Sequence, residues 1–139
     1  MSRQRPDHLG PRMRPRGEEQ HFFDAAREGA IGLGQCQACG AWFLPRVICP
    51  ECWSLDVKPA HAAGRGTLHS YTVCHRAGDS AYADRVPYVV ALVDLEEGVR
   101  MMANLVGDTE PRIGMPLQVT FEARDGDVVV PQFVSAEAA

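Results

Sequence analysis

Two Cys-x2-Cys pairs and five strand-like segments behind them predict a mainly β protein. We expect a short N-terminal helix, a rubredoxin-like zinc ribbon and a C-terminal five-stranded OB-fold barrel. The predicted parts are a disordered basic leader at 1–17, an N-terminal helix segment at 18–34, the ribbon at 35–60, the barrel at 61–135 and a tail at 136–139. The 139 residues suffice for one domain, or for a small domain with an appended module.

The leader differs in charge from the rest of the chain. The first sixteen residues contain five arginines and one aspartate, a net charge of +4, whereas the whole chain carries −4. The remainder is therefore at −8, and its only lysine is Lys58. The leader's Arg, Pro and Gly content predicts disorder. An acidic body is poorly suited to the phosphates of a nucleic acid, so we expect no nucleic-acid partner.

The cysteine content favours a metal site in a reducing compartment. No apolar run approaches the roughly 20 residues of a membrane span, and the N-terminus lacks the apolar core of a signal peptide. We therefore expect a cytoplasmic protein with no membrane contact. Five cysteines, an odd number, argue against a disulfide framework in that compartment and favour metal ligation by four of them.

The segment Glu18 to Gly29 predicts a short helix. It has acidic residues in its first turn, Phe22, Phe23 and Ala26 at facing positions, and Gly29 as a terminator. Helices shorter than about 12 to 15 residues are marginal in water, so the two phenylalanines must dock on this chain or on another protein. The sequence leaves both choices open.

The metal ligands are the clearest prediction. Cys36, Cys39, Cys49 and Cys52 form two Cys-x2-Cys pairs separated by nine residues, and each pair can aim two thiolates at one ion. The segment between them, 41–47, is long enough for two short antiparallel arms. Iron suits four thiolates as well, but a closed site in a short ribbon favours one structural zinc ion. Such a site should not catalyse. Trp53 follows the second pair, where glycine is common.

The second half of the chain reads as five strands. They are Thr67–His75, Pro87–Leu95, Val99–Val106, Leu117–Glu122 and Val128–Phe133. Residues 96–98 and 124–127 are short enough for hairpins between neighbouring strands. Residues 107–114, between the third and fourth strands, are too few for much of a helix. The pattern fits a partly open OB barrel.

Catalytic candidates in the barrel are weak. Cys74 and His75 are adjacent on a strand and point to opposite faces, so they should not form a dyad. We expect Cys74 to be a small core residue. His61, His69 and His75 lack a partner pattern for general base catalysis. The loop 76–85 is long enough to bind a ligand, although a solvent-exposed loop is an equal alternative.

The order of blocks along the chain resembles one family. The blocks are the short helix, CxACG, Pro-Arg, CPxC, GRGTLHSYTV, PYVVALV, ANLVG and RIGMPL. They are similar to the small zinc-ribbon/OB-fold proteins, first catalogued as a domain of unknown function, that accompany thiolase-like proteins. The resemblance covers about Glu18 to Phe133, and the combination of blocks is specific although each block alone is not.

This resemblance implies a non-catalytic subunit paired with a thiolase-fold enzyme in a hetero-oligomer. Such complexes make or break carbon–carbon bonds in acyl-CoA substrates by thiolysis, acyl transfer or steroid side-chain aldol cleavage. It also implies that the helix and ribbon contact the partner and that the barrel shapes the acyl-CoA channel. The candidate contacts with the partner or acyl-CoA are Phe22, Phe23, Arg46, Arg65, Arg76 and Arg85.

Three functions remain open on the sequence alone. An accessory subunit predicts a stable hetero-oligomer and no activity of the isolated chain. A nucleic-acid-binding OB protein predicts salt-sensitive binding of single strands. A hydrolase or transferase acting through Cys74 predicts inactivation by thiol reagents with the zinc retained. The resemblance favours the first.

Overall fold

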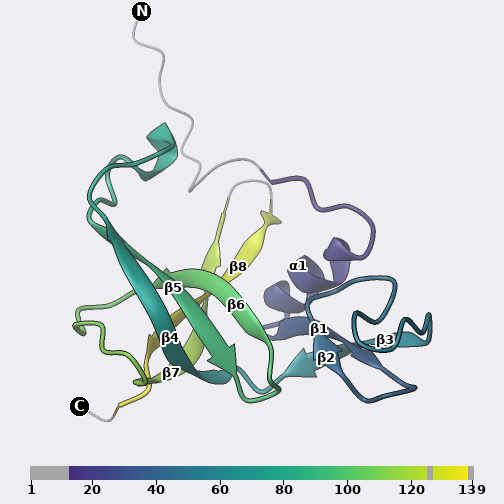
Figure 1. Ribbon diagram of the computed structural model, residues 1–139. Coiled ribbons are helices and arrows are strands. Elements are labelled where there is room, and N and C mark those ends of the chain that lie inside the picture. Colours follow the sequence, from purple (N-terminus) through teal and green to yellow (C-terminus); the bar gives the residue numbers. More distant parts are fainter. Residues whose placement is uncertain (1–12, 125–126, 138–139) are drawn as a thin grey trace, which may run out of the picture.

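The computed structural model describes residues 13–124 and 127–137, which form a zinc-ribbon lobe beside a barrel (Figure 1). The helix is α1 (Glu19–Arg27) and the ribbon strands are β1 (Ile31–Cys36), β2 (Trp42–Phe43) and β3 (Val57–Ala62). The barrel strands are β4 (Arg65–Cys74), β5 (Tyr88–Leu95), β6 (Arg100–Leu105), β7 (Pro116–Ala123) and β8 (Val129–Ser135), with a 3-10 turn η1 (Ser80–Tyr82). The predicted fold class is confirmed. Most of the predicted leader and half of the predicted tail lie outside the described residues.

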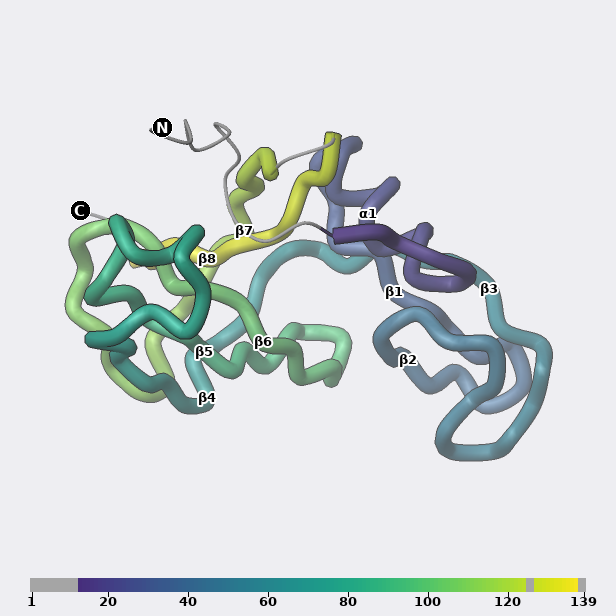
Figure 2. Tube along the Cα trace, turned by 90° about the horizontal axis from the view of Figure 1, so that it is seen from above, coloured from purple at the N-terminus to yellow at the C-terminus, as the bar shows by residue number. Residues whose placement is uncertain are grey.

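The helix α1 docks on its own chain. Ala25 and Ala26 are each 2% exposed, and Phe22 packs against the main hydrophobic core. Gly29 adopts a φ of +81° immediately after the helix, which is the left-handed terminator expected of glycine. Figure 2 shows α1 beside β1, between the barrel and the ribbon. No helix in the described part of the chain is long and apolar enough to cross a membrane.

The helix segment predicted at 18–34 is too long, because residues from Ile31 onward form strand β1. Two glycines allow this strand to lie flat against its neighbours. A Cβ on Gly32 would come within 2.7 Å of the His21 carbonyl oxygen, and a Cβ on Gly34 within 2.8 Å of the Phe43 ring. Close packing of α1 and β2 on the strand therefore requires glycine at both positions.

Strand β1 joins the two lobes. It pairs with β2 on one side and, over six residue pairs, with β3 on the other. Its side chains Ile31 and Leu33 belong to the barrel core, whereas Cys36 at its end belongs to the ribbon core. Strand β3 runs from Val57 to Ala62, across the boundary predicted between 60 and 61. The ribbon and barrel are thus continuous through β1 and β3.

The barrel has the strand order β4-β5-β6-β8-β7 and is closed. All five predicted strands are present, with ends that differ by at most two residues. Leu95 donates its N–H to the Val99 carbonyl at 2.8 Å, and Gly98 with φ +87° completes the predicted hairpin. The core is formed by buried residues of all five strands, including Leu68, Val93, Met101, Leu117 and Phe133.

One junction of the barrel is only partly paired. Strands β6 and β8 run parallel and share a single residue pair, Leu105 with Phe133. Beyond it, the Asn104 N–H donates to the side-chain oxygen of Gln132 at 2.8 Å instead of to a backbone carbonyl. Pro131 on β8 has no N–H to offer. We call this junction the β6–β8 seam.

The Gly-Arg-Gly block at 64–66 has a packing role. A Cβ on Gly66 would lie 2.5 Å from the Asp94 carbonyl oxygen, which is backbone and cannot move freely. We expect Gly66→Ala to lower the free energy of unfolding by about 1 to 3 kcal/mol, as overpacking does. Urea unfolding measures the change. Gly78→Ala is the matched control, since a Cβ there meets nothing within 4 Å; equal stability of the two variants would contradict the prediction.

Candidate functional site

The structure brings the four predicted cysteines together at the end of the ribbon. Their sulfur atoms all lie within 4.8 Å of one another. The Cys36 and Cys52 sulfurs are 3.5 Å apart, and those of Cys39 and Cys49 are 3.6 Å apart. Zinc–sulfur bonds of about 2.3 Å in a tetrahedron place the sulfurs about 3.8 Å apart. The cluster therefore suits one structural zinc ion.

Backbone amides surround the buried thiols. The Cys39 N–H points at the Cys36 sulfur, and the Glu51 and Cys52 N–H groups point at the Cys49 sulfur, at 3.4 to 3.5 Å. The Cys39 N–H is the main cause that lowers the pKa of Cys36 to about 7, despite burial. A lowered pKa favours the thiolate, which is the form that binds metal. The first Cys-x2-Cys turn thus prepares the Cys36 thiolate before the ion arrives.

The other two thiols, those of Cys39 and Cys52, keep their protons until the ion binds. The Ala41 N–H lowers the pKa of Cys39, but burial and the neighbouring thiols outweigh it and raise the pKa to about 12. The pKa of Cys52 is also raised, because the Cys36 thiol and burial outweigh the Ser54 N–H. Metal binding therefore releases protons from this cluster.

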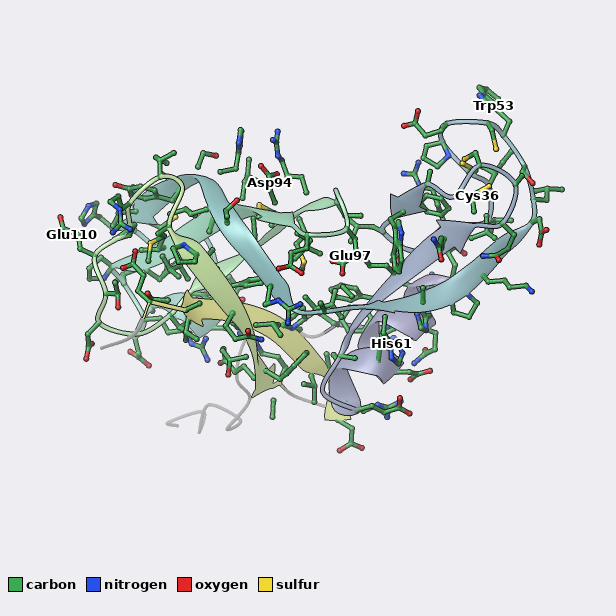
Figure 3. The ribbon with its side chains drawn as sticks, turned by 90° about the horizontal axis from the view of Figure 1, so that it is seen from below. Cys36, Trp53, His61, Asp94, Glu97 and Glu110 are labelled. Atoms are coloured by element: carbon green, nitrogen blue, oxygen red, sulfur yellow. The ribbon has the colours of Figure 1, made fainter. Side chains whose placement is uncertain are left out.

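Trp53 keeps the turn that glycine usually forms. It adopts a φ of +65°, and its N–H donates to the Cys49 carbonyl at 3.0 Å. The indole is 76% exposed and lies beyond Cys36, at the end of the ribbon away from the barrel (Figure 3). Other large exposed apolar side chains of the ribbon are Leu44, Val47, Ile48 and Leu55. The ribbon thus presents apolar groups to its surroundings.

A groove follows the β6–β8 seam. It has a volume of about 450 Å³ and lies between residues 101–104 of β6 and 130–132 of β8. Phe22 and Phe23 of α1 line it, and their rings meet edge to face at 5.3 Å. We call this feature the seam groove. The sequence did not reveal it, although Phe22 and Phe23 were among the predicted contacts.

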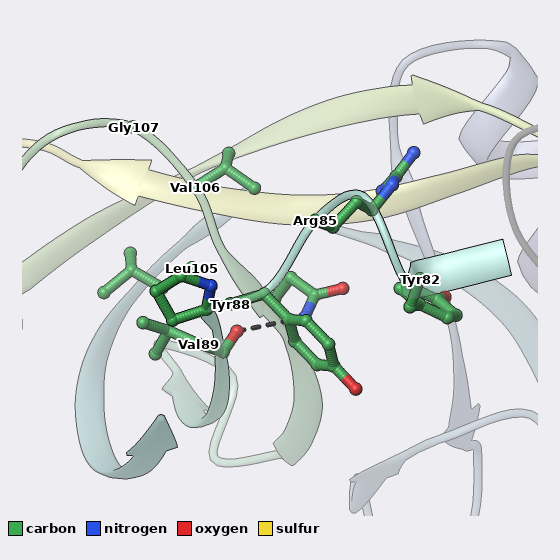
Figure 4. Close-up of a pocket in the computed structure, with 9 residues that line it drawn as sticks. Tyr82, Arg85, Tyr88, Val89, Leu105, Val106 and Gly107 are labelled. Atoms are coloured by element: carbon green, nitrogen blue, oxygen red, sulfur yellow. Dashed lines mark hydrogen bonds between the residues drawn. The ribbon is translucent and has the colours of Figure 1, made fainter. Parts of the chain in front are cut away.

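A second hollow of about 380 Å³ adjoins the groove at Tyr82, Tyr88 and Asn104 (Figure 4). Asn104 donates its side-chain N–H to the Val89 carbonyl at 3.0 Å, the dashed line in Figure 4. Burial is the main cause that raises the pKa of Tyr88, so this phenol stays protonated. The two hollows occupy the face that OB folds commonly use for ligands.

A network of charged and polar side chains lies beside these two hollows. Arg85 donates to Glu122 at 2.5 Å, and the Gln132 side-chain N–H donates to the same carboxylate at 3.3 Å. The Arg124 side chain is 2% exposed, lies 3.5 Å from Glu122 and donates to the Tyr82 hydroxyl at 3.2 Å. The network ties the loop that carries Tyr82 and Arg85 to β7 and β8. That part of the loop is therefore anchored rather than free.

The four predicted arginines fall into two groups. Arg65 donates twice to Glu96, at 3.0 and 3.1 Å, and Arg85 is held by Glu122. Both therefore have structural partners. Arg46 on the ribbon and Arg76 after β4 are exposed, and neither forms an ion pair with another described residue. The structure does not bring the four together at one site.

Among the described residues, Cys74 and the histidines form no catalytic constellation with one another. Cys74 lies at the end of β4 and is partly exposed, so the expectation that it is a core residue was wrong. The strand ends there, and its core side chain, Leu68, lies nearer its start. His69 lies 3.5 Å from Asp94, and Arg100 binds the same carboxylate. His61 stacks on His21 with the ring centres 5.7 Å apart.

Two family models match consecutive parts of this chain. Residues 23–58 match the model described as ChsH2, rubredoxin-like zinc ribbon domain. Residues 60–122 match the model described as ChsH2, C-terminal OB-fold domain. The boundary between the two models falls within β3.

Known proteins similar to the chain include enzyme subunits and scaffolds. It is 36% identical over 133 residues to a probable enoyl-CoA hydratase alpha subunit of Thermomonospora curvata, a match that covers 94% of the chain and 41% of that subunit. It is 38% identical over 102 residues to a DUF35 domain-containing scaffold protein of Methanothermobacter thermautotrophicus, covering 66% of the chain and 75% of that protein. The chain thus spans less than half the length of the hydratase subunit.

A solved structure has the same fold over nearly the whole chain. A chain of the structure titled Ltp2-ChsH2(DUF35) aldolase superposes with a TM-score of 0.81 and 35% identity. The match covers 91% of this chain and 100% of that one.

Proposed function

Because the chain belongs to the DUF35 family of ChsH2-type zinc-ribbon/OB-fold proteins, we propose that it is a non-catalytic accessory subunit of a thiolase-fold enzyme complex. The complex would make or break carbon–carbon bonds in acyl-CoA substrates. The single observation that carries the proposal is the match, at a TM-score of 0.81 over 91% of this chain, to a chain of an aldolase complex. The likeness to a DUF35 scaffold protein supports an accessory role.

The thiolase fold of the partner is supported by the block order in the sequence, which resembles a family that accompanies thiolase-like proteins. The ribbon surface is consistent with such a partner. Trp53 and Leu55 are 76% and 72% exposed, and large aromatic side chains commonly anchor protein interfaces. We therefore assign the ribbon end and α1 to partner contact.

Acyl-CoA recognition falls to the exposed arginines in this proposal. Arg46 and Arg76 can offer their guanidinium groups to CoA phosphates, whereas Arg65 and Arg85 are already bound by carboxylates. Four thiolate ligands require reduced cysteines, so we place the complex in the cytoplasm. The zinc ion, held by four cysteines with no open position, supports the ribbon fold and takes no part in the chemistry.

The proposal is tested by purifying the tagged chain from its native cells. We expect a thiolase-fold protein in fixed ratio by mass spectrometry and light scattering. The isolated chain should show no turnover of acyl-CoA, and its addition should raise the partner's activity or lifetime by about tenfold or more. A lone monomer, or a chain that carries nucleic acid, would overturn the proposal. Turnover by the isolated chain, abolished by Cys74→Ser, would support the thiol-enzyme alternative instead.

A further inference from the structure

The edge of β6 in the seam has backbone groups that none of the described strands covers. Leu95 and Val99 are a hydrogen-bonded pair of the β5–β6 ladder, and such pairs alternate along antiparallel strands. The backbone N–H and C=O groups of Met101, Ala103 and Leu105 therefore point toward β5. The N–H and C=O groups of Met102 face away from β5, toward the seam.

The neighbouring outward groups confirm this alternation. The Asn104 N–H reaches the Gln132 side chain at 2.8 Å, and the Val106 N–H reaches the Phe133 carbonyl at 2.8 Å. Within the described residues, β8 pairs with β6 only at Leu105, so Met102 has no strand partner on this side. Its side chain is 69% exposed. The edge of β6 at Met102 is thus an open template for another strand.

The seam groove provides the space and the chemistry for an added strand. Its walls are mostly apolar, with Phe22 and Phe23 across from β6, and its volume is about 450 Å³. The charges at this end of β6 are satisfied within the chain, because Arg100 binds Asp94 at 2.6 and 3.2 Å. The groove therefore fits an uncharged, apolar segment.

We propose that an extended apolar segment of the partner subunit lies in the seam groove and adds a strand to β6 at Met102. The inference rests on the proposed function, since it requires a partner subunit. An extended peptide supplies a carbonyl to the Met102 N–H and an N–H to its carbonyl, and its alternate side chains enter the groove. An acyl chain in the same place would bury both groups without hydrogen bonds, which is unfavourable. The open edge thus selects a peptide over a lipid.

A pair of substitutions separates backbone pairing from side-chain contact. Met102→Pro removes the outward N–H and leaves the β5–β6 ladder intact, because that N–H is not used in the ladder. Met102→Ala removes the side chain and keeps the N–H. We expect Met102→Pro to weaken binding of the purified thiolase-fold partner by about tenfold or more, which corresponds to about 1.4 kcal/mol, and Met102→Ala to weaken it by less than about threefold. Equal binding of Met102→Pro and the wild-type chain overturns the inference.

A second measurement decides the case if Met102→Pro fails to fold, which zinc content and thermal unfolding reveal. A photoreactive amino acid in place of Met102 is crosslinked in the intact complex and mapped by mass spectrometry. Crosslinks to one extended partner segment support the inference. Crosslinks only to this chain's own residues near Met13, which also lines the groove, or to bound acyl-CoA, overturn it. Failure of the wild-type chain to bind any thiolase-fold protein rejects the proposed function itself, and the strand addition with it.

Discussion

Removal of zinc is expected to unfold the ribbon while the barrel stays folded. The ribbon core consists of Cys36, Phe43 and Cys49, with Ala41 and Val57 packed against it, and two of these residues are metal ligands. So small a core cannot offset the conformational entropy of its loops without the ion. Structural zinc contributes about 10 kcal/mol to modules of this kind. Cys49→Ser, which replaces a buried ligand, should have the same effect as a chelator.

The unfolding is measured by amide exchange and zinc content together. We expect residues 36–56 to lose protection in the presence of a chelator, whereas β4 to β8 retain theirs. The barrel core survives because Leu68, Val93 and Phe133 pack away from the metal. Cys74→Ser is the matched control, since Cys74 lies on β4 outside the cluster and should change neither zinc content nor protection. A chelated chain with a protected ribbon would contradict the prediction.

Local patterns predicted most of the fold. Alternating apolar residues predicted all five barrel strands, and the cysteine spacing predicted the metal cluster. Both patterns can be read from residues that are close together in the sequence. Strand β1 was missed because glycine at 32 and 34 lowers strand propensity. The need for glycine at these two positions becomes visible only in three dimensions, where α1 and β2 pack closely on the strand. The alternation of Ile31 and Leu33 with small residues was the available signal.

The seam groove depends on contacts that no local pattern contains. It exists because Pro131 has no N–H and because β6 and β8, about 28 residues apart, meet at one residue pair. The network beneath it is equally long-range, since Arg85 reaches Glu122 from 37 residues away. Arg65 and Arg85 were predicted as CoA contacts from their charge and from their positions in the linker and the long loop. Their carboxylate partners become visible only in three dimensions.

Replacement of Glu122 by alanine is expected to cost about 2 to 3 kcal/mol of unfolding free energy. Arg85, Arg124 and Gln132 converge on this carboxylate, and the Arg124 side chain is almost fully buried. Loss of one partner from a fully buried ion pair costs about 3 to 5 kcal/mol. The side chains of Glu122 and Arg85 are 25% and 28% exposed, so water reduces the loss. Glu122→Gln keeps the shape and an acceptor oxygen and should cost about 1 kcal/mol.

Acid should weaken the same network, with a sign fixed by the pKa of Glu122. Burial acts to raise this pKa, but the Arg85 hydrogen bond and the charges of Arg124 and Arg85 outweigh burial and lower it below the ordinary value of 4.5. The stabilisation is therefore complete above about pH 4.5 and is lost as the pH falls through the lower folded-state pKa. Urea unfolding at several pH values should show this loss in the wild-type chain and not in Glu122→Gln. Glu96→Gln, at the exposed Arg65–Glu96 pair, is the control and should leave stability nearly unchanged, because water screens exposed ion pairs. If Glu122→Ala were no more destabilising than that control, the network would not be what holds Tyr82 and Arg85 against the barrel.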